Sequence, residues 1–267
     1  MGLRDILVHL DNSAAAAARL DLAIAYAQKH DARLRGLYLI THSYYEPRNI
    51  GEKSASENIE HLFTGKTTAA GVRAEWVYQD CSVMGSSVSD LITLQAYYTD
   101  LIVVGQTNHA SPALNIPLDL PERIVLMSGR PVMIVPYAGK FATAAERVMI
   151  AWKAGRESVR AVTDALPCLE KAHYIALTGV SASSTPAAGA FGGITDLLSC
   201  HGVKTVPEMI NAGSFPIGDM ILNNACEQKI DLLVMGAFAP NRRGKLEISP
   251  VAAHILKHLT VPLLMSH

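Results

Sequence analysis

Two short apolar stretches decide the fold: Asp100-Leu-Ile-Val-Val-Gly105 and Asp231-Leu-Leu-Val-Met-Gly236. Each places aliphatic residues between an aspartate and a glycine, and the two glycines, at 105 and 236, are 131 positions apart. A run of this length between turn-forming residues is typical of a strand that is buried on both faces of a parallel sheet. Its recurrence far along the chain indicates an internal duplication.

Neighbouring strands repeat as well. Arg130-Pro-Val-Met-Ile-Val-Pro136 matches Val261-Pro-Leu-Leu-Met265 at the same offset, and Arg4–Leu10 matches Glu146–Trp152 with Ile6 over Val148, an offset of 142. The first unit is therefore longer by 11 residues, and we expect the surplus in the polar stretch Thr41–Ser56, which has the composition of a loop.

The repeat predicts two domains, residues 1–140 and 146–267, joined by a linker near Gly139–Ala145. In both, apolar runs alternate with helical patterns, which predicts the α/β class: two repeated, doubly wound, Rossmann-like domains, each with a five-stranded parallel sheet. The ligand crevice of such a sheet lies at the carboxyl ends of its first and fourth strands.

The first unit is expected to have five strands, at Ile6–Leu10, Leu34–Ile40, Val72–Tyr78, Leu101–Val104 and Val132–Val135. Four helices are expected between them. The first has an apolar stripe at Leu20, Ala23, Ile24 and Ala27, the second begins at about Glu57, the third carries Val88, Leu91 and Ile92, and the fourth lies near Pro121–Ser128. The second unit repeats the plan, and Val159, Val162, Leu166 and Leu169 form the predicted stripe of its first helix.

Composition excludes several classes of protein. Lys+Arg 23 against Asp+Glu 24 gives a net charge of −1, which argues against a nucleic-acid-binding protein. The chain has 49% hydrophobic and only 18% charged residues, which allows a large core and suggests surface buried between domains or subunits.

The remaining composition points to the cytoplasm. The four cysteines, Cys81, Cys168, Cys200 and Cys226, form no CxxC pair, which favours reduced thiols. Charged residues interrupt any apolar segment at the N-terminus, and the uncharged stretch from Ala172 to Thr195 is rich in Gly, Ser, Thr and Pro. We therefore expect no secretion signal and no contact with a membrane.

With these strands, the endings SGRPVMIVPY and HLTVPLLMSH and the duplication, the chain resembles a tandem universal stress protein over essentially its whole length. The resemblance implies an adenine-nucleotide α-hydrolase-like fold. It also implies two domains that pair through their last strands, as in a family homodimer. The family includes members that bind ATP and members that bind no nucleotide. Its nucleotide motif is Gly, two residues, Gly, nine residues, Gly and then Ser or Thr, with an Asp at the end of the first strand.

The first unit keeps part of this motif. Asp11 ends the first strand and Gly105 fills the first glycine position, but Asn108 stands at the second, and the last pair falls on Leu118 and Asp119. A carboxylate there would repel a phosphate, and no Lys or Arg lies between Gly105 and Arg123. Asp11 is as well suited to capping the next helix, in competition with Asn12 and Ser13, as to accepting from a ribose hydroxyl.

The second unit departs from the motif in other ways. Gly236 fills the first position, Ala239 the second, and Ser249 and Pro250 the last pair, while Lys153 replaces the strand-end aspartate. Ser249 before Pro250 is typical of a helix N-terminus that is capped by its own serine. Arg242, Arg243 and Lys245 put three cations where phosphates would lie, as either an anion contact or a solvated basic turn.

Other constellations are weaker. His254 and His258, four residues apart on a predicted helix, have a spacing that can chelate zinc, but their apolar neighbours favour a packing role and no metal site is predicted. His9 and Trp152 are expected in the core or lining the crevice. No catalytic triad or nucleophile elbow is present in the sequence pattern, so no catalytic residue is predicted.

The sequence thus predicts a cytoplasmic stress-response protein that is not an enzyme, has no required cofactor, and acts by binding a protein partner or a small ligand. The apolar strands Val132–Val135 and Pro262–Met265, at the sheet edges, are candidates for self-association. The alternative is a universal stress protein switch that binds and slowly hydrolyses ATP in the second domain. A different enzyme on the same fold would need an acid, base or nucleophile in the crevice, where the sequence offers only Asp11 and His9.

Overall fold

A computed structural model describes residues 2–40, 50–80, 86–111, 116–141, 143–181, 191–240 and 246–267, with the side chains of 50–55, 239, 240 and 246 left aside. The chain divides into two compact units, unit 1 (Met1–Ala144) and unit 2 (Ala145–His267). Both are of the predicted α/β class, and their repeated architecture confirms the duplication.

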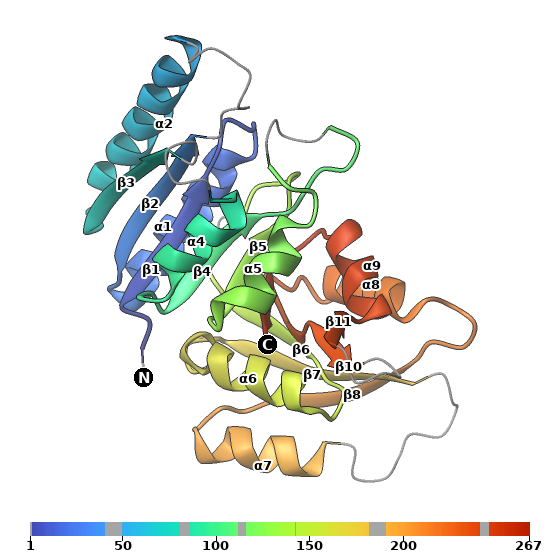
Figure 1. Ribbon diagram of the computed structural model, residues 1–267. Helices are drawn as coiled ribbons and strands as arrows, with labels where there is room; N and C mark the ends of the chain where they lie inside the picture. Colours follow the sequence, from blue (N-terminus) through green and yellow to red (C-terminus); the bar gives the residue numbers. More distant parts are fainter. Residues whose placement is uncertain are drawn as a thin grey trace. The chain divides into compact units, whose positions relative to one another are not determined.

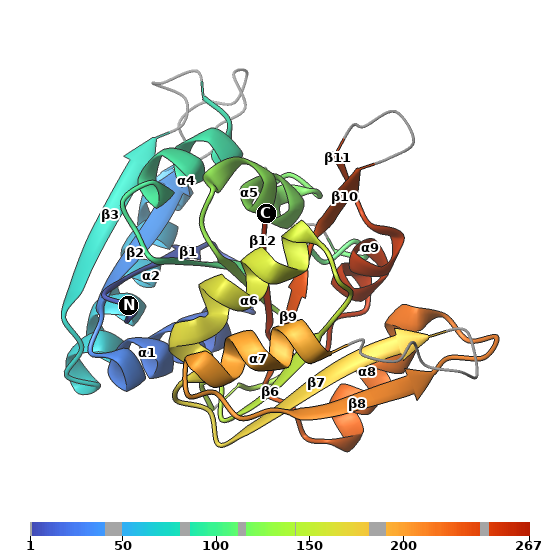
Figure 2. The same cartoon turned by 90° about the horizontal axis from the view of Figure 1, so that it is seen from below.

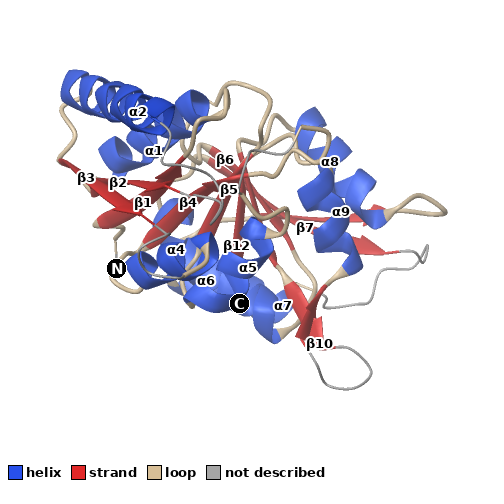
Figure 3. Cartoon of the chain, turned by 45° about the horizontal axis from the view of Figure 1, so that its top comes forward, coloured by secondary structure: helices blue, strands red, loops and turns tan. Residues whose placement is uncertain are grey.

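Unit 1 contains a parallel sheet in the order β3-β2-β1-β4-β5. From β1 the chain adds β2 and β3 on one side, and it then returns to add β4 and β5 on the other side of β1. Because the crossovers are right-handed, α1 and α2 lie on one face of the sheet and α4 and α5 on the other (Figures 1 and 3). Its elements are β1 (Asp5–Leu10), α1 (Ala16–His30), β2 (Arg33–Ile40), α2 (Ile50–Ala69), β3 (Ala74–Asp80), α4 (Val88–Ala96), β4 (Leu101–Gly105), α5 (Leu120–Ser128) and β5 (Val132–Val135).

Unit 2 repeats this order as β12-β9-β6-β7-β8, again with parallel neighbours. Helices α6 and α7 lie side by side, and α8 packs against α9 (Figure 2). Its elements are β6 (Arg147–Ala151), α6 (Arg156–Leu169), β7 (Tyr174–Ser181), α7 (Gly192–Cys200), β8 (Val206–Asn211), α8 (Ile217–Glu227), β9 (Leu232–Gly236), β10 (Phe238–Pro240), β11 (Leu246–Ile248), α9 (Pro250–Lys257) and β12 (Leu263–Ser266).

The core forms where the apolar patterns predicted it. Leu20, Ala23, Ile24 and Ala27 are all buried on α1, and the four aliphatic residues of β4 and of β9 are buried as well. Because both faces of these central strands are covered by helices, their sequences are continuously apolar instead of alternating.

Two expectations about elements are corrected, and one pair of strands is new. Helix α2 begins at Ile50, so the second part of the predicted loop Thr41–Ser56 is helical, while residues 41–49 lie outside the described residues. Its Glu, Lys and Ala residues are good helix formers, which outweighs its polar composition. Val159 on α6 is 41% exposed, because the buried face of that helix is turned toward Ala161, Ala165 and Cys168. The antiparallel β10–β11 pair was not predicted.

None of the described helices has the length and apolar character that crossing a membrane requires.

Candidate functional site

The crevice of unit 1 begins where β1 and β4 end side by side. The two strands pair through Val8 and Val103, which brings Asp11, just beyond β1, close to Gly105 at the end of β4. This is the point at which the order of the sheet reverses, and ligands of doubly wound sheets bind at such points. The structure therefore brings together the strand-end aspartate and the first glycine of the motif, as the sequence predicted.

The side chain of Arg19 occupies this position. Arg19 lies in the first turns of α1, and its Nη1 and Nη2 atoms are each 3.1 Å from Asp11 Oδ2. Nη1 also donates to the His9 carbonyl oxygen at 2.7 Å, and Nη2 to Ser13 Oγ at 3.4 Å. The side chains of Arg19 and Asp11 are only 3% and 15% exposed, so this ion pair is largely withdrawn from water.

Gly105 is required for this arrangement. A Cβ atom added there would lie 2.5 Å from Arg19 Nη2 and 2.7 Å from Arg19 Cζ, which is closer than real Cβ contacts. The glycine in the first motif position thus leaves room for the chain's own guanidinium group.

Asp11 does not cap helix α1, contrary to one of the two predicted roles. The helix N-cap is Ala15, without a side-chain hydrogen bond in the described part of the chain, and Asp11 Oδ1 instead accepts from the Ser13 backbone N–H at 2.9 Å. Asn12 donates to the Tyr38 hydroxyl at 2.8 Å and Ser13 Oγ accepts from Arg19, so neither competitor caps the helix either. Asp11 is committed to the turn after β1 and to Arg19.

Burial and the neighbouring charges shift the pKa values of this cluster in a consistent way. Burial alone would raise the pKa of Asp11, but the charge of Arg19, with His9 and the Ser13 hydrogen bonds, lowers it well below its usual range. Burial lowers the pKa of His9 from 6.5 to about 4, Asp11 opposes this shift and Arg19 adds to it. At neutral pH the cluster therefore consists of a neutral imidazole beside an ion pair.

The remaining motif positions of unit 1 are used for local structure. Asn108 Oδ1 accepts from the backbone N–H groups of Ala110 at 3.0 Å and Ser111 at 3.2 Å, which closes a turn. Asp119 pairs with Arg123 at 2.7 Å one helical turn later. Leu118 is 46% exposed.

Backbone atoms cover the first glycine position of unit 2. A Cβ atom at Gly236 would lie 2.8 Å from Glu157 C and 2.8 Å from Ser158 N, because the first turn of α6 packs directly on the end of β9. Lys153, in the position of Asp11, is exposed. The two units therefore cover the same glycine position differently, one with a side chain and the other with a helix terminus.

Ser249 begins α9 as predicted: its Oγ accepts from the Ala252 backbone N–H at 3.1 Å, and Pro250 occupies the first turn. Ala239 lies in β10, opposite Glu247 of β11. Arg242, Arg243 and Lys245, in the segment that connects these two strands, lie outside the described residues.

Of the two histidines, His254 in α9 contacts a carboxylate, and His258 lies just beyond the end of the helix. His254 Nε2 lies 2.6 Å from Asp219 Oδ1, and the rings of His254 and His258 are 4.7 Å apart. The described residues contain no group of three or more His, Cys, Asp or Glu side chains that could hold a metal ion. His9 is buried at 2% exposure and Trp152 is partly buried, in line with a core or lining role.

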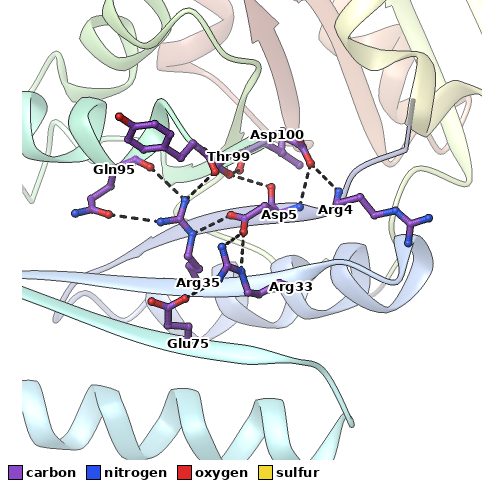
Figure 4. A network of polar contacts seen from close by, with 10 residues as sticks. Arg4, Asp5, Arg33, Arg35, Glu75, Gln95, Thr99 and Asp100 are labelled. Carbon is purple, nitrogen blue, oxygen red and sulfur yellow. Dashed lines mark hydrogen bonds and ion pairs between the residues drawn. The ribbon is translucent and has the colours of Figure 1, made fainter.

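The opposite, amino-terminal edge of the unit 1 sheet carries a second polar network (Figure 4). Asp5, at the start of β1, pairs with the two arginines of β2: Oδ2 accepts from Arg33 Nε at 2.7 Å and Oδ1 from Arg35 Nε at 2.8 Å. Arg33 extends the network to Glu75 of β3 at 3.0 Å, and Arg35 to the Gln95 carbonyl at 3.2 Å. These contacts tie β1, β2, β3 and α4 together far from the crevice.

The aspartate of the duplicated stretch has the same role in each unit. Asp100 Oδ2 accepts from the backbone N–H groups of Arg4 at 2.8 Å and Asp5 at 3.0 Å (Figure 4). Asp231 accepts from Glu146 at 3.0 Å and Arg147 at 2.8 Å. Sequence reasoning treated this aspartate as a strand boundary only; its recurrence before both central strands was the signal of a structural role.

Arg19 was likewise missed. A charged residue among Ala16, Leu20 and Ala23, which are all buried on α1, is unusual unless it has a buried partner. That pattern, eight residues after Asp11, could have identified the pair.

Comparison with known proteins shows similarity of structure only. No protein-family model and no curated protein matches the sequence. A universal stress protein from Archaeoglobus fulgidus DSM 4304 aligns with a TM-score of 0.70 at 16% identity, covering 98% of this chain and 97% of that one.

Two proteins of Pseudomonas aeruginosa also align over nearly the whole length. One, from strain PAO1, is described as functionally unknown and has a TM-score of 0.61 at 16% identity, covering 99% of this chain and 92% of that chain. The other, a candidate universal stress protein from strain UCBPP-PA14, has a TM-score of 0.61 at 17% identity, with 99% and 93% covered. At these identities the likeness establishes the fold.

Proposed function

We propose that this chain, which has the fold of universal stress proteins in two repeated units, is a stress-response protein that acts by binding a protein partner or small ligand and catalyses no reaction. The observation that carries the proposal is the Arg19 guanidinium group, held by Asp11 against Gly105. Asp11, for which ribose binding was one of the two predicted roles, accepts from an arginine of the same chain instead.

The two candidate acid–base groups at the crevice of unit 1, His9 and Asp11, support a non-catalytic role. His9 is buried and its pKa is lowered to about 4, and Asp11 is held ionised by its neighbours. A general acid or base acts best with a pKa near the working pH, and a proton must be able to reach it. His9 meets neither condition, and the pKa of Asp11 lies far below a neutral working pH.

Unit 2 supports the same conclusion by different contacts. The first turn of α6 packs on Gly236, Ser249 uses its hydroxyl on the backbone of α9, and Lys153 offers donors where an acceptor is needed. We propose that nucleotide is not required by either unit. In this proposal the protein works in the cytoplasm and binds neither membrane nor nucleic acid.

Association is the other part of the proposal. β5 and β12 each stand at one end of the strand order of their own unit and are wholly apolar except for Ser266. An apolar strand at such a position favours pairing with another strand. We propose that the protein self-associates through its apolar edge strands; light scattering that finds only monomers at cellular concentration would exclude this association.

The first experiment examines nucleotide in the freshly purified, unsupplemented protein. After denaturation and removal of the chain, the supernatant is analysed by chromatography and mass spectrometry, and the native protein is then titrated with ATP by calorimetry. We expect no released nucleotide and no saturable heat. ATP or ADP released at one mole per mole of chain would refute the proposal.

The alternative, an ATP-binding switch in unit 2, is favoured by one feature: Arg242, Arg243 and Lys245 put three cations within four positions between β10 and β11. Cations at this density attract phosphate groups. Replacing all three with alanine should abolish ATP binding if the alternative is correct.

The matched control removes three other cations of unit 2, Arg160, Lys204 and Lys257, and so changes the net charge by the same amount. Loss of binding in both triple variants would indicate a general charge effect, whereas loss in the first alone would locate the site between β10 and β11.

A further inference from the structure

Arg19 is held in unit 1 by its terminal guanidinium nitrogens. Its acceptors are the His9 carbonyl oxygen, Asp11 Oδ2 and Ser13 Oγ, at distances from 2.7 to 3.4 Å. All three acceptors belong to the end of β1 and the turn that follows it. Five consecutive residues therefore supply one carboxylate and two neutral oxygens to a single planar cation.

The floor of this cradle is Gly105, where any side chain would collide with Arg19 Nη2. The Nε atom of Arg19 is buried and has no hydrogen-bond partner among the described residues. The polar contacts thus recognise the end of the side chain, which a free guanidinium ion shares, and not the part that joins it to the helix.

We propose that unit 1 contains a guanidinium-binding site which is occupied by a residue of its own chain, and that this internal ligand keeps the crevice closed to external ones. This inference deepens the proposed function, and it rests on the part of that proposal which says that unit 1 binds no nucleotide. Arg19 is then the residue that determines which ligands unit 1 excludes, in addition to contributing to its core.

A site of this kind can be emptied and refilled. Arg19→Ala removes the internal ligand. The carboxylate of Asp11 stays buried, and the oxygen atoms that accepted from Arg19 then face a cavity. The variant should be less stable than the parent, and methylguanidinium chloride should restore stability by binding the folded state alone. We expect a saturable rise in Tm on the order of 4 °C at ten times a dissociation constant on the order of 1 mM.

Three controls make the measurement specific. The parent protein, whose site is already filled, should show no rise. Arg73→Ala, which removes an exposed guanidinium group from its 3.7 Å ion pair with Asp31, should show none either. The double variant Asp11→Asn/Arg19→Ala should lose the response, because the site then lacks its charge. Sodium chloride at equal ionic strength corrects for screening.

A folded Arg19→Ala variant whose Tm is unchanged by methylguanidinium, or is raised no more than that of Arg73→Ala, would overturn the proposal. If Arg19→Ala does not fold, the parent and Arg19→Lys are compared by ¹⁵N NMR of arginine side chains. A bound guanidinium group gives separate, slowly exchanging Nη–H signals, and one such set should disappear in Arg19→Lys. A single averaged Nη signal for Arg19 in the parent would contradict the proposal.

The outcome is separable from that of the proposed function. ATP binding by the parent protein would refute the proposed function, and if its site is in unit 2 the guanidinium response of Arg19→Ala is still expected. Failure of the guanidinium response would leave the absence of nucleotide in the parent protein untouched.

Discussion

Lowering the pH from 7 to 4 is expected to destabilise unit 1 through His9. The side chain is 2% exposed at the end of β1, and burial, with the nearby charge of Arg19, lowers its pKa from 6.5 to about 4 against the opposing charge of Asp11. Between these two pKa values the unfolded chain binds a proton at His9 that the folded chain does not. The stability of unit 1 that depends on neutral His9 is therefore fully present above pH 6.5, and it is lost progressively as the pH falls toward 4.

The size of the effect follows from the two pKa values. Each unit of difference corresponds to about 1.4 kcal/mol, so the loss attributable to His9 reaches about 3 kcal/mol by pH 4. This loss is a large part of the roughly 5–15 kcal/mol that is typical of the stability of a domain. Protonation of carboxylates at about pH 4 would lower the stability further.

The assay is urea unfolding at half-unit steps from pH 7 to pH 4, for the parent and for His9→Gln, which keeps a polar side chain but does not titrate. We expect the free energy of unfolding of the parent to fall by about 3 kcal/mol more than that of the variant over this range. His61→Gln, at an exposed position of α2, is the control and should follow the parent. Parallel pH profiles for the parent and His9→Gln would refute the reasoning.

Three further predictions concern positions in both units. Asp100→Ala and Asp231→Ala should each destabilise their own unit by about 1–3 kcal/mol, measured by urea unfolding, because two backbone donors lose a charged acceptor; equal stability of either variant and the parent would contradict this role. Gly236→Ala should lower the free energy of unfolding by about 1–3 kcal/mol, and by more than Gly105→Ala does. The added methyl group collides with helix backbone at Gly236 and with the end of a side chain at Gly105. The reverse order of stabilities in thermal unfolding would show that the buried guanidinium group is the more rigid neighbour. Ser249→Ala should lower stability by about 1 kcal/mol through the lost cap of α9 and leave any ATP titration unchanged, and a changed titration would assign the hydroxyl to a ligand instead.

The sequence predicted the fold well because the signal is local and repeated. Continuous apolar runs such as 101–104 identify buried parallel strands without knowledge of their partners, and the second copy provides an independent test of each assignment. Once the order of strands is given, the handedness of crossovers determines which face of the sheet each helix covers. The start of α2 was missed because polar residues with good helix propensity resemble a loop in composition.

The candidate site was predicted only in its outline. The motif placed Asp11 and Gly105 at the crevice, but the group between them comes from α1, and the spacing within the motif contains no information about it. The same holds at Gly236, where the neighbour is the backbone of α6. What fills a crevice is set by packing between elements, and a pattern read along one segment does not contain it.

The strand-start aspartates Asp100 and Asp231 show that each sheet has an anchored end and an adaptable end. At the anchored end, both copies fasten the first strand by the same two backbone hydrogen bonds. At the adaptable end, one copy has an arginine and the other a helix terminus over an equivalent glycine. Because the fastening lies a full strand length from the crevice, either crevice can be redesigned to take a chosen ligand while its sheet keeps the contacts that start it. The duplicated chain thus offers two separately adjustable sites on one repeated scaffold.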